Sequence, residues 1–341
     1  MTPLHTRRVT TGRLTQQITE ARTEGEAVVF VHGNVSSSAF WHSTLTTLPD
    51  RYRPLAVDLR GFGGTDPLPV DATRGLRDYA DDLAELLTAL GIERAHLVGW
   101  SMGGGVVMQF LRDHPAAVRS VTLVSPVSPY GFGGTHGADG TLNSPDGAGS
   151  GGGTANPEFV RLLAEGDRGQ DSQASPRTVL TTCYVKPPFE TEHEDAYVES
   201  MLATRLGDDH YPGDSKPSTA WPGVAPGTRG VLNCMAPNHF RVDDLHLVDP
   251  KPPVLWIRGE DDIIVSDTSL FDLAHLGAIG VVPGWEGIPA QPMLAQTRHV
   301  LDRYAAAGGS VREVAVADAG HAVHLERPEE FGTALLEVLS A

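Results

Sequence analysis

Short apolar runs alternate with segments of helical periodicity over the first third of the chain and again near its end. The runs at 27–31 and 95–100 have the length of strands, and further strands are expected at residues 55–59, 118–124, 254–258 and 311–316. Apolar residues recur at helical spacing in residues 76–90, 102–112, 293–306 and 327–339. Continuous apolar runs are typical of strands that are buried on both faces. The pattern therefore predicts an α/β chain with a doubly wound, mostly parallel sheet, and residues 8–23 add one or two edge strands.

The alternation stops after Pro126 and resumes near residue 250. Residues 131–153 are mostly Gly, Ser, Thr, Asp and Asn, which is typical of a mobile loop. Residues 156–206 again have a helical pattern, and residues 231–247 are compatible with one more helix. We therefore predict three parts, namely the first part of the core over residues 1–126, an inserted, mainly helical lid over 127–249, and the second part of the core over 250–341.

Charge and cysteine content narrow the classes of partner. The 43 acidic and 26 basic residues give a net charge of −17, which argues against nucleic acid or an anionic membrane as a partner. Two cysteines do not form a disulfide framework, and no segment has the pattern of a signal peptide or a membrane span. We expect a cytoplasmic protein that acts on a small molecule, whereas the oligomeric state is unknown.

Ser101 lies between a predicted strand and a predicted helix, in the sequence Gly99-Trp100-Ser101-Met102-Gly103. This arrangement is typical of a nucleophile elbow, in which the serine has a strained backbone and the glycines allow close approach of neighbouring chains. The turn would also place the Met102 amide at the positive end of a helix, where it can stabilise an oxyanion. The alternative is a glycine-rich turn that only packs tightly or binds a phosphate.

A serine nucleophile needs a base to take its proton and an acid to orient that base. After an elbow, the acid and then the histidine are expected, each beyond a later strand. Asp262 follows the run at 254–258, and His321 follows the run at 311–316. Asp261 is the alternative acid. The other histidines lack metal-ligand spacing, so we expect no metal and no cofactor.

With these residues the chain resembles the α/β-hydrolase superfamily. The motifs that carry the resemblance are His32-Gly33-Asn34, residues 60–66, Gly99-Trp100-Ser101-Met102-Gly103, Gly259-x-x-Asp262, and Gly320-His321 with residues 325–331. The resemblance implies the α/β-hydrolase fold, with Ser101 as nucleophile and His321 as base. It implies Asp262 as the orienting acid, because the family's spacing favours Asp262 over Asp261. It also implies an oxyanion hole made by the backbone amides of Asn34 and Met102.

Residues 32–41 are similar to the corresponding loop of haloalkane dehalogenases, in which the asparagine contacts halide and the nucleophile is an aspartate. In this chain Ser101 occupies the nucleophile position. A serine ether could not be hydrolysed by acyl chemistry, so we do not expect dehalogenase or epoxide hydrolase activity.

We therefore predict a serine hydrolase that cleaves a carboxylic ester or lactone of a bulky apolar molecule through an acyl-enzyme. The candidate substrate contacts are Trp100, Val35, Trp41 and Trp285. The alternative enzymes are an aminopeptidase of the proline iminopeptidase type, a C–C bond hydrolase, and a thioesterase or acyltransferase. The alternative of a different class is a non-catalytic module that binds a small molecule.

Overall fold

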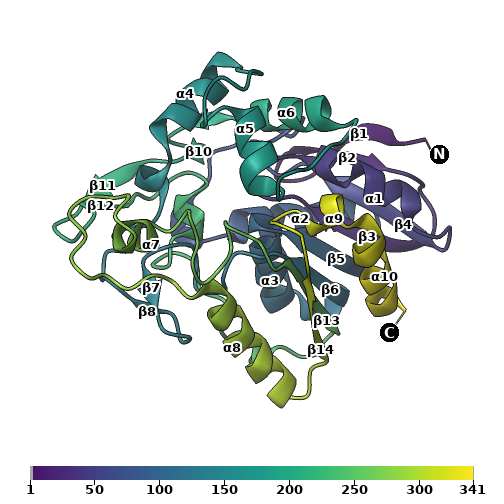
Figure 1. The fold of residues 1–341 in the computed structure, drawn as a ribbon. Helices are drawn as coiled ribbons and strands as arrows, with labels where there is room; N and C mark the ends of the chain where they lie inside the picture. Colours follow the sequence, from purple (N-terminus) through teal and green to yellow (C-terminus); the bar gives the residue numbers. More distant parts are fainter. Residues whose placement is uncertain (1–2, 341) are drawn as a thin grey trace.

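The computed structural model describes residues 3–340, which contain one eight-stranded sheet (Figure 1). Its strands are β1 (His5–Thr10), β2 (Thr15–Glu20), β3 (Glu26–Val31), β4 (Tyr52–Val57), β5 (Ala95–Trp100), β6 (Val118–Val124), β13 (Val254–Gly259) and β14 (Val311–Val316). They lie in the order β1-β2-β4-β3-β5-β6-β13-β14. The pairs from β4 to β14 are parallel, whereas β1–β2 and β2–β4 are antiparallel. The predicted doubly wound, mostly parallel sheet is confirmed.

Helices cover both faces of this sheet, which is why the apolar runs are continuous. They are α1 (His42–Thr47), α2 (Arg77–Ala89), α3 (Met102–Asp113), α8 (Met293–Ala306), α9 (Val323–Glu326) and α10 (Pro328–Leu339). In Figure 1, α1 and α10 contact each other on one side of the strands, and α2 and α3 contact each other on the opposite side. All six residues of β5 are buried between these two layers. No helix within residues 3–340 combines the length and the apolar character that crossing a membrane requires.

The chain between β6 and β13 contains the predicted lid, and we call residues 127–249 the insertion. Its regular elements are α4 (Pro157–Glu165), α5 (Pro176–Val179), a π-turn (Leu180–Tyr184), α6 (Glu194–Leu202), and the strands β7 (Thr135–His136), β8 (Thr141–Leu142), β9 (Leu206–Gly207), β10 (Tyr211–Pro212), β11 (Ser215–Pro217) and β12 (Val224–Pro226). Helices are therefore confined to its middle, so "mainly helical" overstates their share. The boundaries of the three parts stay predictions, and residues 1, 2 and 341 of those ranges lie outside the described residues.

Two predictions within the insertion are wrong. Residues 231–247 form only two short 3-10 turns, Asn233–Met235 and Leu245–Leu247, instead of a helix. Ala236 has an extended backbone with ψ 141°, as expected before Pro237, and this ends the first turn.

The segment 131–153 is compact and well packed, whereas a mobile loop was predicted from its composition. The Gly133 amide donates to Oε1 of Gln291 at 2.6 Å, and Nε2 of Gln296 donates to the carbonyl of Gly137 at 3.0 Å. Gly131 has a φ of 88° and Gly133 a φ of 78°, conformations that glycine adopts without strain. The glycines thus build tight turns that are held by side chains distant in the sequence.

Candidate active site

Ser101 forms the turn between β5 and α3. Its φ of 57° and ψ of −120° are rare for a residue with a side chain. The turn is held on both sides, because the Ser101 amide donates to Val124 on β6 at 2.9 Å and the Ser101 carbonyl accepts from Val127 at 3.0 Å. Strain of this kind persists only where the surrounding structure enforces it.

The elbow glycines are required by close backbone contacts. A Cβ atom on Gly103 would lie 2.4 Å from the carbonyl oxygen of Val31 and 2.5 Å from that of His32. A Cβ atom on Gly99 would lie 2.3 Å from the carbonyl oxygen of Gly103. The tight packing brings β5, α3 and the end of β3 together around Ser101.

His321 and Asp262 meet at the carboxyl ends of β14 and β13. Nδ1 of His321 lies 2.8 Å from Oδ2 of Asp262, and the two side chains are only 2% and 3% exposed. The other carboxylate oxygen of Asp262 accepts the amides of Ile264 at 2.8 Å and Val265 at 3.0 Å. These bonds fix the carboxylate, so that it can hold the imidazole ring in one orientation.

Asp261, the alternative acid, lies outside this pair. Its side chain is 45% exposed, and Oδ2 lies 2.8 Å from Nζ of Lys186. The structure therefore brings Asp262, and not Asp261, against His321.

Ser101 is adjacent to this pair but is not hydrogen-bonded to it. The indole of Trp100, the residue before Ser101, donates to the carbonyl of His321 at 3.0 Å, and the rings of Trp100 and His321 are 5.5 Å apart. Within residues 3–340, no hydrogen bond joins the Ser101 hydroxyl to His321. Such contacts are often loose in an enzyme without substrate and tighten in the complex.

The loop that follows β3 lies directly against Ser101. A Cβ atom on Gly33 would come within 3.0 Å of the Cβ atom of Ser101, so Asn34 lies next to the elbow in space. Among the groups of residues 3–340, neither the Asn34 amide nor the Met102 amide has a hydrogen-bond acceptor. Two free N–H groups beside a serine could stabilise an oxyanion.

A buried histidine holds this loop. Nε2 of His32 accepts the amide of Leu59 at 3.0 Å, and Nδ1 lies 2.7 Å from the carbonyl of Gly33. Burial lowers the pKa of His32 to about 4, so the ring is neutral at pH 7. The neutral tautomer with its proton on Nδ1 therefore donates to Gly33 and keeps the loop in place.

The structure does not gather the four candidate substrate contacts into one pocket. Trp41 has no exposed surface and stacks on His324 at 4.1 Å, so it lies in the core, and its role as a substrate contact stays a prediction. Trp285 is 39% exposed, and its indole donates to Ile288 within its own loop, which follows α7 (Leu273–Ala278). Trp100 and Val35 adjoin Ser101 and Asn34 but are almost fully buried, so their roles stay predictions.

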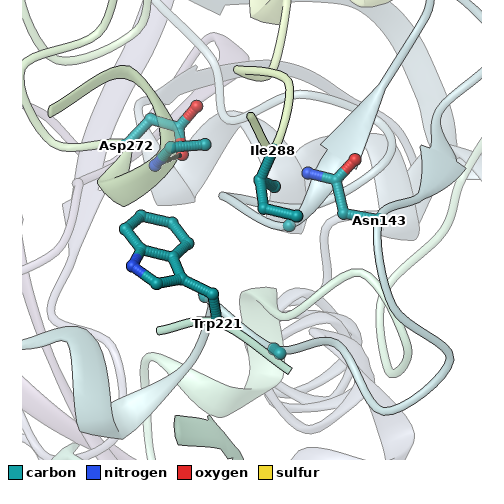
Figure 2. A pocket seen from close by; sticks show the side chains of 8 residues that line it. Asn143, Trp221, Asp272 and Ile288 are labelled. Carbon is teal, nitrogen blue, oxygen red and sulfur yellow. Dashed lines mark hydrogen bonds between the residues drawn. The ribbon is translucent and has the colours of Figure 1, made fainter. Parts of the chain in front are cut away.

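Two cavities lie near these elements. The larger, of about 230 Å³, is lined by Lys186, Pro187, Pro188, Phe189, Asp318, Glu326 and Arg327, beside the loop that carries His321. Figure 2 shows the smaller, of about 10 Å³, between Asn143, Trp221, Asp272 and Ile288. It has room for about one water molecule, and none of the candidate site residues lines it. Within residues 3–340, no three His, Cys, Asp or Glu side chains gather as metal ligands would.

Sequence reasoning did not predict the contacts that Tyr184, Lys186 and Glu326 make around the candidate site. The Tyr184 hydroxyl reaches the carbonyl of Asn34 at 3.0 Å, and Glu326 accepts the amide of Gly320 at 2.7 Å. Glu326 belongs to a motif that carried the family resemblance, whereas no pattern in the sequence marks Tyr184.

The family model described as the alpha/beta hydrolase fold matches residues 26–151. A dihydrolipoyllysine-residue acetyltransferase component from Cupriavidus necator is 44% identical over 108 residues, which are 32% of this chain and 28% of that protein. A carboxylesterase from Bacillus subtilis, named as uncharacterized, is 33% identical over 117 residues, which are 34% of this chain and 38% of that protein. The chain thus spans well under half the length of these curated relatives.

The similarity to solved structures extends over the whole chain. An esterase from Rhodococcus sp. ECU1013 superposes with a TM-score of 0.62 and 20% identity, covering 100% of this chain and 99% of that one. At this identity the likeness shows the fold alone. Together with the strand order and the family match over residues 26–151, it shows that the chain has the α/β-hydrolase fold.

Proposed function

We propose that this protein is a serine hydrolase that cleaves a carboxylic ester or lactone through an acyl-enzyme. The observation that carries the proposal is the buried hydrogen bond between His321 and Asp262, next to the strained elbow at Ser101. The proposal is further supported by the esterases among its relatives and structural neighbours.

In the proposed mechanism, the Ser101 hydroxyl attacks the carbonyl carbon and its proton moves to Nε2 of His321. Asp262 stabilises the imidazolium through Nδ1, and the Asn34 and Met102 amides stabilise the tetrahedral oxyanion. His321 then gives its proton to the leaving alkoxide, which departs as an alcohol. A water molecule, deprotonated by His321, attacks the acyl-enzyme and releases the acid with Ser101 restored.

An aromatic cluster beside His321 supports a bulky, apolar substrate. The Trp100 ring stacks on Phe40 at 5.2 Å and meets the edge of Tyr184 at 5.6 Å. These rings are almost fully buried, so the surface that they present beside His321 is a small apolar one, which favours an apolar acyl or aryl group over a small polar one.

The test is hydrolysis of a panel of aryl esters, alkyl esters and lactones by the wild type and by Ser101→Ala. We expect turnover to peak on bulky esters or lactones and to fall roughly 10⁴-fold or more in Ser101→Ala. Ser218→Ala is the matched control, because Ser218 lies in the insertion and bonds to Asp146. Turnover that survives in Ser101→Ala would refute the proposal. Stoichiometric ligand binding without turnover would instead identify a binding module.

A further inference from the structure

Tyr184 joins the insertion to the loop that carries the predicted oxyanion hole. It ends the π-turn Leu180–Tyr184, and its hydroxyl donates to the carbonyls of Asn34 at 3.0 Å and Val35 at 3.3 Å. The side chain is largely buried, and its ring packs 5.6 Å from Trp100 and 6.4 Å from His321. Burial raises the pKa of the Tyr184 hydroxyl well above its usual value, so it stays a donor throughout the working pH range.

The peptide that Tyr184 contacts is strained. Val35 is a β-branched residue with a φ of 46°, a conformation that such residues adopt only under external constraint. The bonds from Tyr184 act on the carbonyls on either side of this strained residue. The Asn34 N–H belongs to the preceding Gly33–Asn34 peptide, so Tyr184 acts on it through the Asn34 Cα. Without the bonds from Tyr184, the Asn34–Val35 and Val35–Ser36 peptides could rotate to relieve the strain, which would shift the Asn34 Cα and with it the Asn34 amide.

The main chain of the same segment contacts the loop that carries His321. The Ala322 amide donates to the carbonyl of Tyr184 at 2.8 Å. Two residues later, the Lys186 amide donates to Oε1 of Glu326 at 2.5 Å, and Oε2 of Glu326 accepts the Gly320 amide at 2.7 Å. Residues 184–186 therefore link the loop that follows β3 with the loop that carries His321.

We propose that Tyr184 is a positioning residue, which holds the Asn34 amide toward Ser101 and makes a complete oxyanion hole depend on docking of the insertion. This inference rests on the proposed serine hydrolase function. Its consequence is that the hydroxyl of Tyr184 affects the reaction step, where the oxyanion forms, more than it affects substrate binding.

The experiment compares Tyr184→Phe with Tyr197→Phe. Tyr197 is a matched control because it lies on α6 of the same insertion and stacks on Phe40 at 4.6 Å, without a bond to the Asn34 loop. Losing one oxyanion-hole donor costs roughly 10²- to 10³-fold in kcat, and we expect about a 10- to 100-fold loss when a donor is only displaced. Tyr184→Phe should therefore lower kcat by that factor with KM nearly unchanged, whereas Tyr197→Phe should keep both.

A second readout separates positioning from a general structural effect. Affinity for a boronic acid, which forms a tetrahedral adduct with the serine, should fall in Tyr184→Phe in proportion to kcat. Tyr184 replaced by 4-aminophenylalanine keeps a donor at the same place and should restore kcat to within about threefold, by the same argument. If Tyr184→Phe folds poorly, the variant with 4-aminophenylalanine still tests whether a donor at this place is needed for kcat.

The outcomes separate the two proposals. If the wild type turns over esters and Ser101→Ala does not, the hydrolase function stands, and an unchanged kcat in Tyr184→Phe then overturns the role of Tyr184 alone. A kcat of the 4-aminophenylalanine variant as low as that of Tyr184→Phe would also overturn the proposed role of Tyr184. A wild type without turnover on the panel would instead count against the hydrolase function itself.

Discussion

The strand-end region and the insertion are held in different ways. We define the strand-end region as the loops after β3, β5, β13 and β14, which carry Asn34, Ser101, Asp262 and His321. Neighbouring parallel strands end at the same edge of a sheet, so the sheet's hydrogen-bond register brings these loops together. In the insertion, by contrast, the paired strands are only two or three residues long, and buried side chains supplement the backbone bonds between its turns. Asn233 alone accepts the Gly152 amide at 2.8 Å and donates to the Arg229 carbonyl at 2.6 Å.

Because of this difference, substitutions in the two regions are expected to have different effects. In the strand-end region the backbone is set by the fold, so a substitution acts on chemistry or on close packing. In the insertion, a buried polar side chain such as Asn233 bonds several turns at once, so one substitution can loosen more than one turn. Tyr184 lies where the two regions meet.

The largest expected effect distinguishes two adjacent aspartates of the strand-end region. Asp262→Asn should lower kcat by roughly 10³- to 10⁴-fold, because the amide cannot hold His321 in the required tautomer. Asp261→Asn should change kcat less than about threefold, because Asp261 bonds to Lys186 at the surface. Steady-state kinetics of the two variants decides this, and equal losses would mean that the acid is misassigned.

The second prediction compares one glycine from each region. Gly103→Ala should cost about 4 kcal/mol or more of unfolding free energy, because its Cβ would meet backbone atoms of Val31 and His32 that cannot move independently. Gly223→Ala in the insertion should cost about 1–2 kcal/mol, because its φ of 91° is strained for alanine but the space around it is open. Denaturant unfolding measures both, and a milder effect at Gly103 would contradict the close packing of the elbow.

The third prediction tests whether side chains hold the insertion. Asn233→Ala leaves buried backbone groups without partners and should cost about 2–3 kcal/mol of local stability. Amide hydrogen exchange should accelerate within residues 127–249 and stay unchanged in β5 and α3. Asn238→Ala, which removes an exposed side chain with one 3.5 Å contact, is the control. Faster exchange throughout the sheet would show that the two regions are not independent.

The last prediction concerns an acid sensitivity at His324, which lies on α9 next to the strand-end region. Burial, and secondarily the charge of His321, lowers the pKa of His324 to about 3. In the unfolded chain His324 binds a proton below about pH 6.5, whereas in the folded chain it stays neutral down to about pH 3. The free energy of unfolding therefore falls as the pH drops from about 6.5 toward 3. This one group contributes a slope of about 1.4 kcal/mol per pH unit in that window. His324→Phe should flatten the slope by this amount in denaturant titrations between pH 6 and 4, and an unchanged slope would contradict the assignment.

Local patterns were sufficient to predict most of the strand-end region. Strands at 95–100, 118–124 and 311–316 and the helix at 293–306 have the predicted bounds, because strand-length segments and helical spacing are properties of neighbouring residues. The order of Asp262 and His321 after later strands also followed from the sequence. The choice between Asp261 and Asp262 rested on family spacing, and the geometry now favours Asp262.

The rest depends on contacts between distant residues. Tyr184 and Asn34 are 150 positions apart, and no periodicity links a tyrosine in a π-turn to a loop after β3. The segment 131–153 has the composition of a flexible loop, yet Gln291 and Gln296 satisfy its backbone. Trp41 is a candidate substrate contact, and only the fold shows that its ring is packed in the core.

The measurement that tests the central claim most directly is mass spectrometry after treatment with a fluorophosphonate probe. The account predicts one covalent adduct per chain, located on the peptide that contains Ser101 and absent from Ser101→Ala. Labelling should also slow strongly in Asp262→Asn, because His321 is then a poorer base, and should continue in Asp261→Asn. A wild-type protein that stays unlabelled, or that carries the adduct on another residue, would contradict the assignment of Ser101 as an activated nucleophile.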